Sequence, residues 1–262
     1  MKLALSISLL LAACGSDGGN GSGNDGGNDA GSGSDAGNGS GSDAGTDPDG
    51  SELECGTLRG VIRDFKIDHP DFEVIPADPA PVILGLVNLT ITPGGKPTLS
   101  QSAAAAGLIS SSTSFGQWYT DVPGINMHLE QDFALDSQLD GSFVYDNGAY
   151  FPIDGQGFGN ESNSHNFHFT TELHATFPYN GAEKFTFRGD DDVWVFVNGK
   201  LAIDIGGVHS AEEATIDFDA RAVELGITIG NEYAIDFFQA ERHTTQSNFR
   251  IETTIACFGT IF

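Results

Sequence analysis

The feature that most constrains this chain is a two-residue alternation of apolar and polar side chains, which recurs from about residue 140 onward. In the segment from Phe167 to Phe177 the phenylalanines occupy one set of alternate positions, whereas His168, Glu172 and His174 occupy the other. Successive side chains of a β-strand point to opposite faces, so this period predicts strands and not helices. The segment is therefore predicted to be a half-buried antiparallel strand with solvated histidines.

A hairpin signal strengthens this prediction. The apolar runs 193–197 and 201–205 are separated by Asn198, Gly199 and Lys200, and Asn-Gly is the strongest short signal for a two-residue hairpin turn. One short helix is expected over residues 101–108, where alanines cluster. Many short strands between Gly, Asn and Pro residues predict an all-β fold, an antiparallel β-sandwich of jelly-roll-like character.

Residues 15–50 differ from the rest because they consist almost wholly of Gly, Ser, Asn, Asp and Ala. Such a segment cannot bury enough apolar surface to fold, so it is predicted to be a disordered stalk. A Gly-rich coil of this length spans about 30–36 Å. We divide the chain into a leader (1–13), a lipid-bearing Cys14 with its linker (14–54), and a folded domain (55–262).

The leader has the pattern of an export signal. Lys2 supplies a positive charge, and an apolar stretch runs from Leu3 to Leu11, which is too short to span a bilayer. It ends in Leu-Ala-Ala-Cys14, which resembles a bacterial lipobox. The resemblance implies that Cys14 carries palmitate-like acyl chains and anchors the protein in the cell envelope, on the surface of the outer membrane. The alternative is an ordinary signal peptide with a chance cysteine.

The two other cysteines, Cys55 and Cys257, open and nearly close the folded region. An exported protein meets an oxidising environment, and the two ends of a domain often lie close together. A Cys55–Cys257 disulfide is therefore predicted, and two unpaired thiols are the alternative.

The charge restricts the partners. With 37 acidic and 11 basic residues the formal net charge is −26. Such a surface repels nucleic acid and anionic lipid, so no nucleic acid and no membrane contact beyond the lipid anchor are expected. It tolerates bound divalent cations, although solubility alone is a sufficient reason for much of this acidity.

One block carries a family resemblance. The run 187–201, with Gly189 followed by Asp190, Asp191 and Asp192, resembles the fibro-slime domain. Fibro-slime domains are similar in turn to the protective antigen fourteen (PA14) domain, a β-sandwich. The resemblance implies a calcium ion held by consecutive aspartates, which binds sugar hydroxyls in the lectin members. Supporting pieces lie at 63–65, 69–73, 118–119, 151–154, 204–209, 240–243 and 247–249.

The chemistry of the acidic block agrees with a hard cation, because calcium takes six to eight oxygen ligands and favours carboxylates. We predict Asp190, Asp191 and Asp192 as ligands, completed by Asn198 and Asp204. The alternative is a solvated acidic turn at the start of a strand.

The predicted ligand site adds Trp118, Trp194 and His209. The tryptophans are candidates for stacking on sugar rings, although burial in the core is the commoner fate of such residues. His209 is assigned to the ligand and not to the ion, since calcium prefers oxygen.

No acid–base pair is singled out, so the chain is not expected to be an enzyme. The sequence thus predicts a surface lipoprotein that adheres to glycans or extracellular polymer. The alternative is a structural envelope or matrix domain in which calcium only rigidifies loops.

Overall fold

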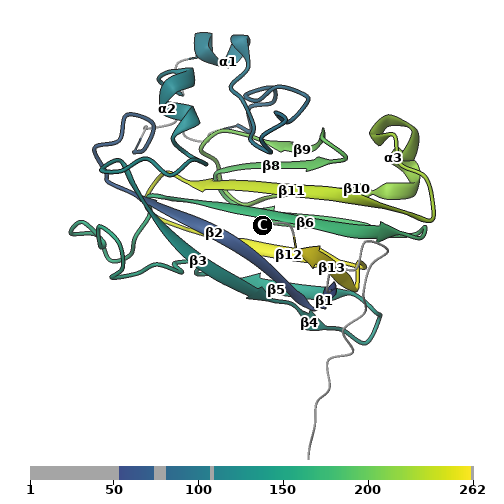
Figure 1. Ribbon diagram of the computed structural model, residues 1–262. Coiled ribbons are helices and arrows are strands. Elements are labelled where there is room, and N and C mark those ends of the chain that lie inside the picture. The colour runs from purple at the N-terminus through teal and green to yellow at the C-terminus, as the bar shows by residue number, and fades with distance from the viewer. Residues whose placement is uncertain (1–52, 74–80, 107–108, 261–262) are drawn as a thin grey trace, which may run out of the picture. The chain divides into compact units, whose positions relative to one another are not determined.

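The computed structural model describes residues 53–73, 81–106 and 109–260. Within them, two antiparallel β-sheets pack face to face (Figure 1). The predicted all-β sandwich is confirmed. Cys14 and the stalk lie outside the described residues.

The larger sheet has eight strands, and its main path runs β3-β2-β6-β11-β8-β9. The strand β6 pairs along one edge with two partners, because β2 takes its first half, up to Leu173, and β13 takes its end, around Thr176. The sheet comprises β1 (Leu53–Cys55), β2 (Thr57–Phe65), β3 (Asn126–Ala134), β6 (Phe169–Tyr179), β8 (Asp192–Val197), β9 (Lys200–Ile205), β11 (Asn231–Glu241) and β13 (Cys257–Thr260).

The smaller sheet has five strands in the order β10-β7-β12-β5-β4. Its strands are β4 (Asp136–Ser137), β5 (Phe143–Asn147), β7 (Lys184–Gly189), β10 (Glu212–Asp217) and β12 (Phe249–Thr253). Phenylalanines from both sheets, among them Phe187, Phe237 and Phe249, fill the space between the sheets with ring centroids 5.2–5.5 Å apart. This interior is the main hydrophobic core.

A third layer covers the outer face of the larger sheet, the face turned away from the smaller sheet. It contains α1 (Gln101–Ala106) and α2 (Ser112–Gly116), which Figure 1 shows beside β8 and β9. Under it, side chains such as Trp194, Phe196 and Phe238 form a second apolar cluster. The run 193–197 is continuously apolar because both of its faces are buried.

The third layer also corrects the expectation of a half-buried strand. In the first half of β6 the polar residues are buried together with the apolar ones: Thr170, Glu172 and, just before the strand, His168 are at most 2% exposed, whereas His174 is partly exposed. The prediction of solvated histidines is thus wrong for His168. The alternation of apolar and polar residues predicts the strand, but it cannot show that a segment distant in sequence covers the polar face of that strand.

The hairpin between β8 and β9 is confirmed. Asn198 and Gly199 have φ values of 51° and 73°, as a type I′ turn requires, and Val197 pairs with Lys200. The predicted helix over 101–108 is observed as α1 to the extent that the chain is described there. A further helix, α3 (Phe218–Leu225), was not expected.

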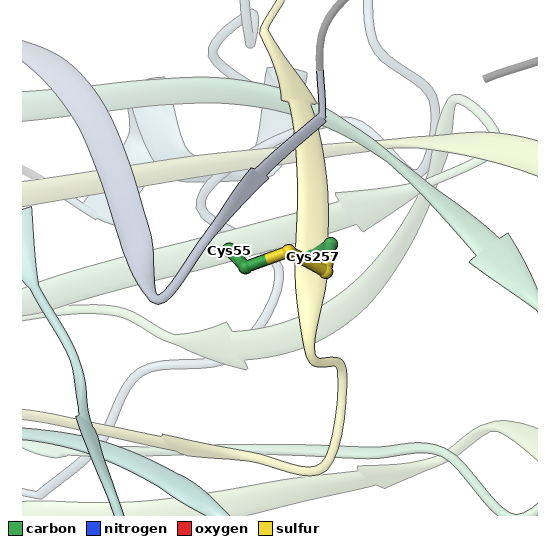
Figure 2. The surroundings of a disulfide bond; sticks show 2 residues. All are labelled: Cys55 and Cys257. Carbon is green, nitrogen blue, oxygen red and sulfur yellow. A yellow bond between two sulfur atoms is a disulfide. The ribbon is translucent and has the colours of Figure 1, made fainter. Parts of the chain in front are cut away.

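The predicted disulfide is confirmed. Cys55 in β1 faces Cys257 in β13, with sulfurs 2.00 Å apart (Figure 2). It joins the first and last strands of the domain and closes a loop with a sequence separation of 202 residues. In the described part of the chain, no helix is long and apolar enough to cross a membrane.

Candidate functional site

The three consecutive aspartates form the corner at which the chain passes from one sheet to the other. The strand β7 ends at Gly189 in the smaller sheet, and β8 begins at Asp192 in the larger sheet. A Cβ atom on Gly189 would lie 2.3 Å from the carbonyl oxygen of Asn248, so no larger residue fits there. Asp191 is left-handed, with φ of 56°. This sharp corner turns all three carboxylates into the protein, where each is at most 3% exposed.

Two of these carboxylates have protein partners on both oxygens. The amide groups of Asn248 bind Asp190 at both oxygens, from the backbone nitrogen and, at 2.7 Å, from Nδ2. Asp192 accepts from the backbone nitrogen of Gly207 at 2.7 Å and from Nε of Arg242 at 2.6 Å. Asp191 accepts a hydrogen bond at Oδ2 from the backbone nitrogen of Arg242 at 2.7 Å.

Arg242 is the buried cation of this corner. Its side chain is fully buried, its Nη1 donates to the carbonyl oxygen of Asp71 at 3.0 Å, and the guanidinium lies 5.0 Å from the ring centre of Trp118. Burial lowers the pKa of Arg242, but the charges of Asp192 and Asp191 outweigh burial and raise it above the usual value. The guanidinium therefore stays charged and balances Asp192 across their ion pair.

Glu241 brings a fourth carboxylate to the corner. It ends β11, is fully buried, and neither of its oxygens has a hydrogen-bond partner of acceptable geometry among the described residues. Burial raises its pKa well above the usual range, and the charges of Asp191 and Asp190 raise it further, although Ser247 offsets a part. Burial likewise raises the pKa of Asp191 to about 7, against the lowering effect of Arg242. Both carboxyls resist ionisation because the corner holds too little positive charge.

The alternation of β11 places these groups. Phe238 and Ala240 belong to the outer apolar cluster, so Gln239 and Glu241 point to the inner face, toward the space between the sheets. Several other buried polar atoms near this end of the sheet also lack a partner within the described part of the chain: Gln239 Oε1, Ser247 Oγ and His209 Nε2.

These donors are mostly hard oxygens, which is what a cation such as calcium requires. The described residues nevertheless contain no group of three or more His, Cys, Asp or Glu side chains arranged for a metal ion. A cation here would accordingly be held by Asp191 and Glu241, with amide, hydroxyl or backbone oxygens as further ligands.

Two predicted ligands lie outside this set. The Nδ2 atom of Asn198 donates to the carbonyl oxygen of Leu225 at 3.0 Å, at the end of α3, and is separated from the corner by the whole of β8. Asp204 accepts from Nε1 of Trp194 at 3.1 Å and from the backbone nitrogen of Gly85 at 2.7 Å. Burial raises the pKa of Asp204, and these two bonds lower it in part. The side chains of Asn198 and Asp204 are thus hydrogen-bonded to other parts of the fold, away from Asp191 and Glu241.

The predicted sugar-stacking residues are core residues in this structure. Trp118 and Trp194 are fully buried in the outer cluster, with ring centroids 6.3 Å apart. Neither ring is open to a ligand. His209 is buried beside the corner, and its Nδ1 lies 2.8 Å from the carbonyl oxygen of Ser210.

Glu241 was missed by sequence reasoning. It occurs in the segment 240–243, which carried part of the family resemblance, but a glutamate in an alternating strand gives no sign of its burial. The useful signal was its position next to Arg242, since an acidic and a basic residue closing a strongly apolar strand indicate a charged cluster at the strand end.

Comparison with known proteins identifies the family to which this β-sandwich belongs. The model of the PA14 domain matches residues 126–257, half of the chain, from β3 to the start of β13. The chain belongs to the PA14 domain family. The narrower resemblance to fibro-slime domains stays a prediction.

Relatives of this PA14 chain occur in Dictyostelium discoideum. Protein psiR is 37% identical over 203 residues, which cover 72% of this chain and 20% of psiR. Protein psiC is 37% identical over 204 residues, which cover 71% of this chain and 38% of psiC. The chain thus spans between a fifth and two fifths of the length of these two relatives.

Two solved structures also match. One is described as a PA14 sugar-binding domain from an RTX adhesin, at 10% identity and a TM-score of 0.31, covering 78% of this chain and 99% of that one. The other is the PA14 domain of the MpAFP antifreeze protein, at 12% identity and a TM-score of 0.29, covering 73% and 78%. The family assignment rests on the sequence match and not on these superpositions.

Proposed function

We propose that this PA14 domain is a non-enzymatic binding module that adheres to glycans or extracellular polymer, with a calcium ion at the corner formed by Asp190, Asp191 and Glu241. When bound, the ion would supply a site for sugar hydroxyl groups. The side chains of Asp191 and Glu241 would hold it, and Asn248 would keep Asp190 in place beside them.

The observation that carries this proposal is a pair of buried carboxyls whose pKa values burial raises because the corner holds too little positive charge. Asp191 and Glu241 lie together in the interior, and Arg242, the buried cation nearest to them, is already paired with Asp192. An isolated ionised carboxylate in an apolar interior is costly unless it meets a cation. A divalent ion that binds the folded state would remove this cost.

Calcium titration by calorimetry on the full chain, with thermal unfolding in parallel, tests the cation site. We expect saturable binding that stabilises the wild type, by about 2.7 kcal/mol at a hundredfold excess over Kd. Asp191→Asn should abolish both effects. Asp140→Asn is the matched control, since Asp140 lies in an exposed turn where its carboxylate accepts hydrogen bonds from the neighbouring Ser142. Equal binding by both variants and the wild type would refute the corner as the site.

A structural role is the second candidate, and one observation favours it. The aromatic rings Trp118, Tyr119 and Trp194 are all buried, so none of them is available to stack on a sugar at the corner. A glycan screen with calcium and with a chelator separates the two candidates. Calcium-dependent glycan binding supports the adhesion module, whereas calcium binding without any glycan supports a rigidifying ion.

We propose in addition that Cys14 carries the lipid that tethers the domain to the envelope. The support is the Leu-Ala-Ala-Cys sequence after an apolar leader. Metabolic labelling with a palmitate analogue tests it. Label on the wild type and none on Cys14→Ser is expected, and equal label on both would contradict the anchor.

A further inference from the structure

A second site candidate lies on the outer face of the larger sheet, where the third layer leaves a pocket of about 600 Å³. Its floor is formed by the neighbouring strands β3, β2 and β6 (Figure 1), and Lys96 from the loop before α1 forms part of its wall. The volume is within the range of about 300–1,000 Å³ that small-molecule sites occupy.

The pocket gathers an unusual share of the basic residues of this chain, beside the acidic Glu130, Asp132 and Glu172. Arg59, Arg63 and Lys96 line it, and they are three of the 11 lysine and arginine residues in a chain with 37 acidic residues. His128 and His174 line it as well. Cationic and hydrogen-bond donor groups are therefore concentrated on this face of an otherwise acidic protein.

One buried carboxylate holds the inner cations together. Glu172 is 2% exposed, and its Oε2 binds Nη1 of Arg63 at 2.5 Å. Its other oxygen binds Nζ of Lys96 and, at 2.6 Å, Nε2 of His174. Three donors from two strands and one loop therefore converge on a single point of the pocket floor.

His174 adds a charge at neutral pH. Burial lowers its pKa, but Asp236, 2.6 Å from Nδ1, and Glu172, at Nε2, outweigh burial and raise the pKa to about 9. The imidazolium, like Arg63 and Lys96, is thus fixed in place before any ligand arrives.

The inner groups keep hydrogen-bond capacity for a ligand. The Lys96 side chain is 36% exposed and that of His128 is 39% exposed, and the Nη2 of Arg63 makes no hydrogen bond to a described residue. His128 and Arg63 are cross-strand partners, held by the carboxylate of Asp121 at 2.9 and 2.7 Å. The inner end of the pocket is accordingly rich in donors.

The rim has the opposite character. Glu130 and Asp132 line the pocket on β3, and the Asp132 side chain is 72% exposed, with Arg59 across from it in the strand register. Carboxylates at the rim accept hydrogen bonds from hydroxyl groups. The pocket therefore offers donors at its inner end and acceptors at its mouth.

We infer that this pocket binds the carboxylate-bearing sugar residues of an acidic polysaccharide, with the sugar carboxylate at Lys96, Arg63 and His128 and the ring hydroxyls at Glu130 and Asp132. This inference deepens the proposed binding function but uses a site apart from the acidic corner and needs no calcium. Charge-assisted bonds from Arg and Lys to a carboxylate supply the selectivity over neutral sugars.

Calorimetry of the full chain with trigalacturonate, in chelator, tests the inference, with the neutral galactotriose as the comparison ligand. Lys96→Met removes an inner donor and retains the aliphatic stem. Lys184→Met is the matched control, because Lys184 is a 55% exposed lysine on the smaller sheet, paired with Asp217. We expect trigalacturonate binding to weaken about tenfold in Lys96→Met and to stay unchanged in Lys184→Met, with no binding of galactotriose.

Several outcomes would overturn the inference: no trigalacturonate binding up to millimolar concentration, equal binding of both sugars, or equal loss in both variants. Arg59→Met, at the exposed rim, is a second variant that keeps the test possible if Lys96→Met unfolds. We expect it to weaken trigalacturonate binding less than Lys96→Met does. Because calcium is removed throughout, failure here leaves the calcium-dependent function standing. In a parallel titration with calcium restored, sugar binding that appears only with calcium and is equal in Lys96→Met and wild type would place the sugar at the corner alone.

Discussion

The acidic corner and the outer pocket both bury carboxylates, but they balance the charge in opposite ways. In the pocket, the cations Arg63, Lys96 and His174 surround Glu172, and Asp121 and Asp236 occupy the far sides of two of them. Three positive groups thus face three carboxylates. At the corner, four carboxylates meet one guanidinium, that of Arg242.

The pKa directions follow this difference. The pKa of Glu172 is lowered despite burial, because its hydrogen bonds to His174 and Lys96 outweigh the loss of water. Burial instead raises the pKa of Asp191 and of Glu241, because Arg242 offsets only a part of this effect at Asp191 and Ser247 only a part at Glu241. Buried carboxylates are stable as anions only where the fold brings cations to them, and where it does not, an external cation has a role.

Removing Arg242, the guanidinium that the described residues bring to the corner, should have the largest effect. Arg242→Met leaves Asp192 buried without its ion pair, so we expect a loss of about 3–5 kcal/mol in the free energy of unfolding, measured with urea. Arg250→Met is the control, because its ion pairs with Asp146 and Glu252 are exposed and should cost less than about 1 kcal/mol. A loss below 1 kcal/mol for Arg242→Met would show that the corner tolerates an unpaired aspartate. If Arg242→Met does not fold, Arg242→Lys should retain part of the stability.

Removing a surplus corner carboxylate should act in the other direction. Without metal at pH 8, Glu241→Gln should stabilise the protein by about 1–3 kcal/mol, because burial opposes ionisation of Glu241 in the folded protein but not in the unfolded chain, and a neutral amide does not carry this cost. With saturating calcium the order should reverse, since the wild type gains the binding energy and the variant does not. The unfolding midpoints of wild type and Glu241→Gln, measured in chelator and in calcium, test whether the order of stability reverses. The same order in both buffers would mean that Glu241 does not contact the ion.

The two regions should also respond to pH in different windows. Asp191 has a folded pKa of about 7 against about 3.9 unfolded, so the metal-free protein should lose stability as pH rises from about 4 to 7. His174 has a folded pKa of about 9 against about 6.5 unfolded, so its contribution is complete below pH 6.5 and lost as pH rises to 9.

His174→Gln tests the second window. We expect it to remove the decline between pH 6.5 and 9, at a cost of at most about 3 kcal/mol at pH 6, and to leave the decline between pH 4 and 7 in place. Urea unfolding across pH measures both windows, with Asp191→Asn as the reciprocal control. Loss of both declines in one variant would mean that the two regions are coupled.

The sequence predicts the parts of this structure that depend on local pattern. The alternation gives the strands, Asn198 and Gly199 give the hairpin, and the positions of Cys55 and Cys257 give the disulfide. Each signal lies in residues close in sequence or at the ends of one domain, where geometry restricts the alternatives.

The parts it does not predict depend on distant packing. Glu241 and Asp191 meet because β11 pairs with β8, and Glu172 is buried because residues 81–106 and 109–125 cover the sheet. Asn198 lies at the far end of the β8–β9 hairpin and binds Leu225, whereas Asp204, opposite Trp194, accepts hydrogen bonds from Trp194 and from the distant Gly85. Proximity in sequence to the acidic block was a poor guide to proximity in space.

The smallest expected loss of stability gives the most direct comparison of the two regions. Lys96→Met removes one cation from the pocket, as Arg242→Met does at the corner. Glu172 keeps Arg63 and His174, and the Lys96 side chain is partly exposed, so the loss should stay below about 1 kcal/mol at pH 7. Urea unfolding of the two variants side by side measures the difference. A loss above 2 kcal/mol in the free energy of unfolding of Lys96→Met would mean that the pocket, like the corner, depends on one cation. The presence of several cations around Glu172 would then no longer explain why Glu172 stays ionised while Glu241 does not.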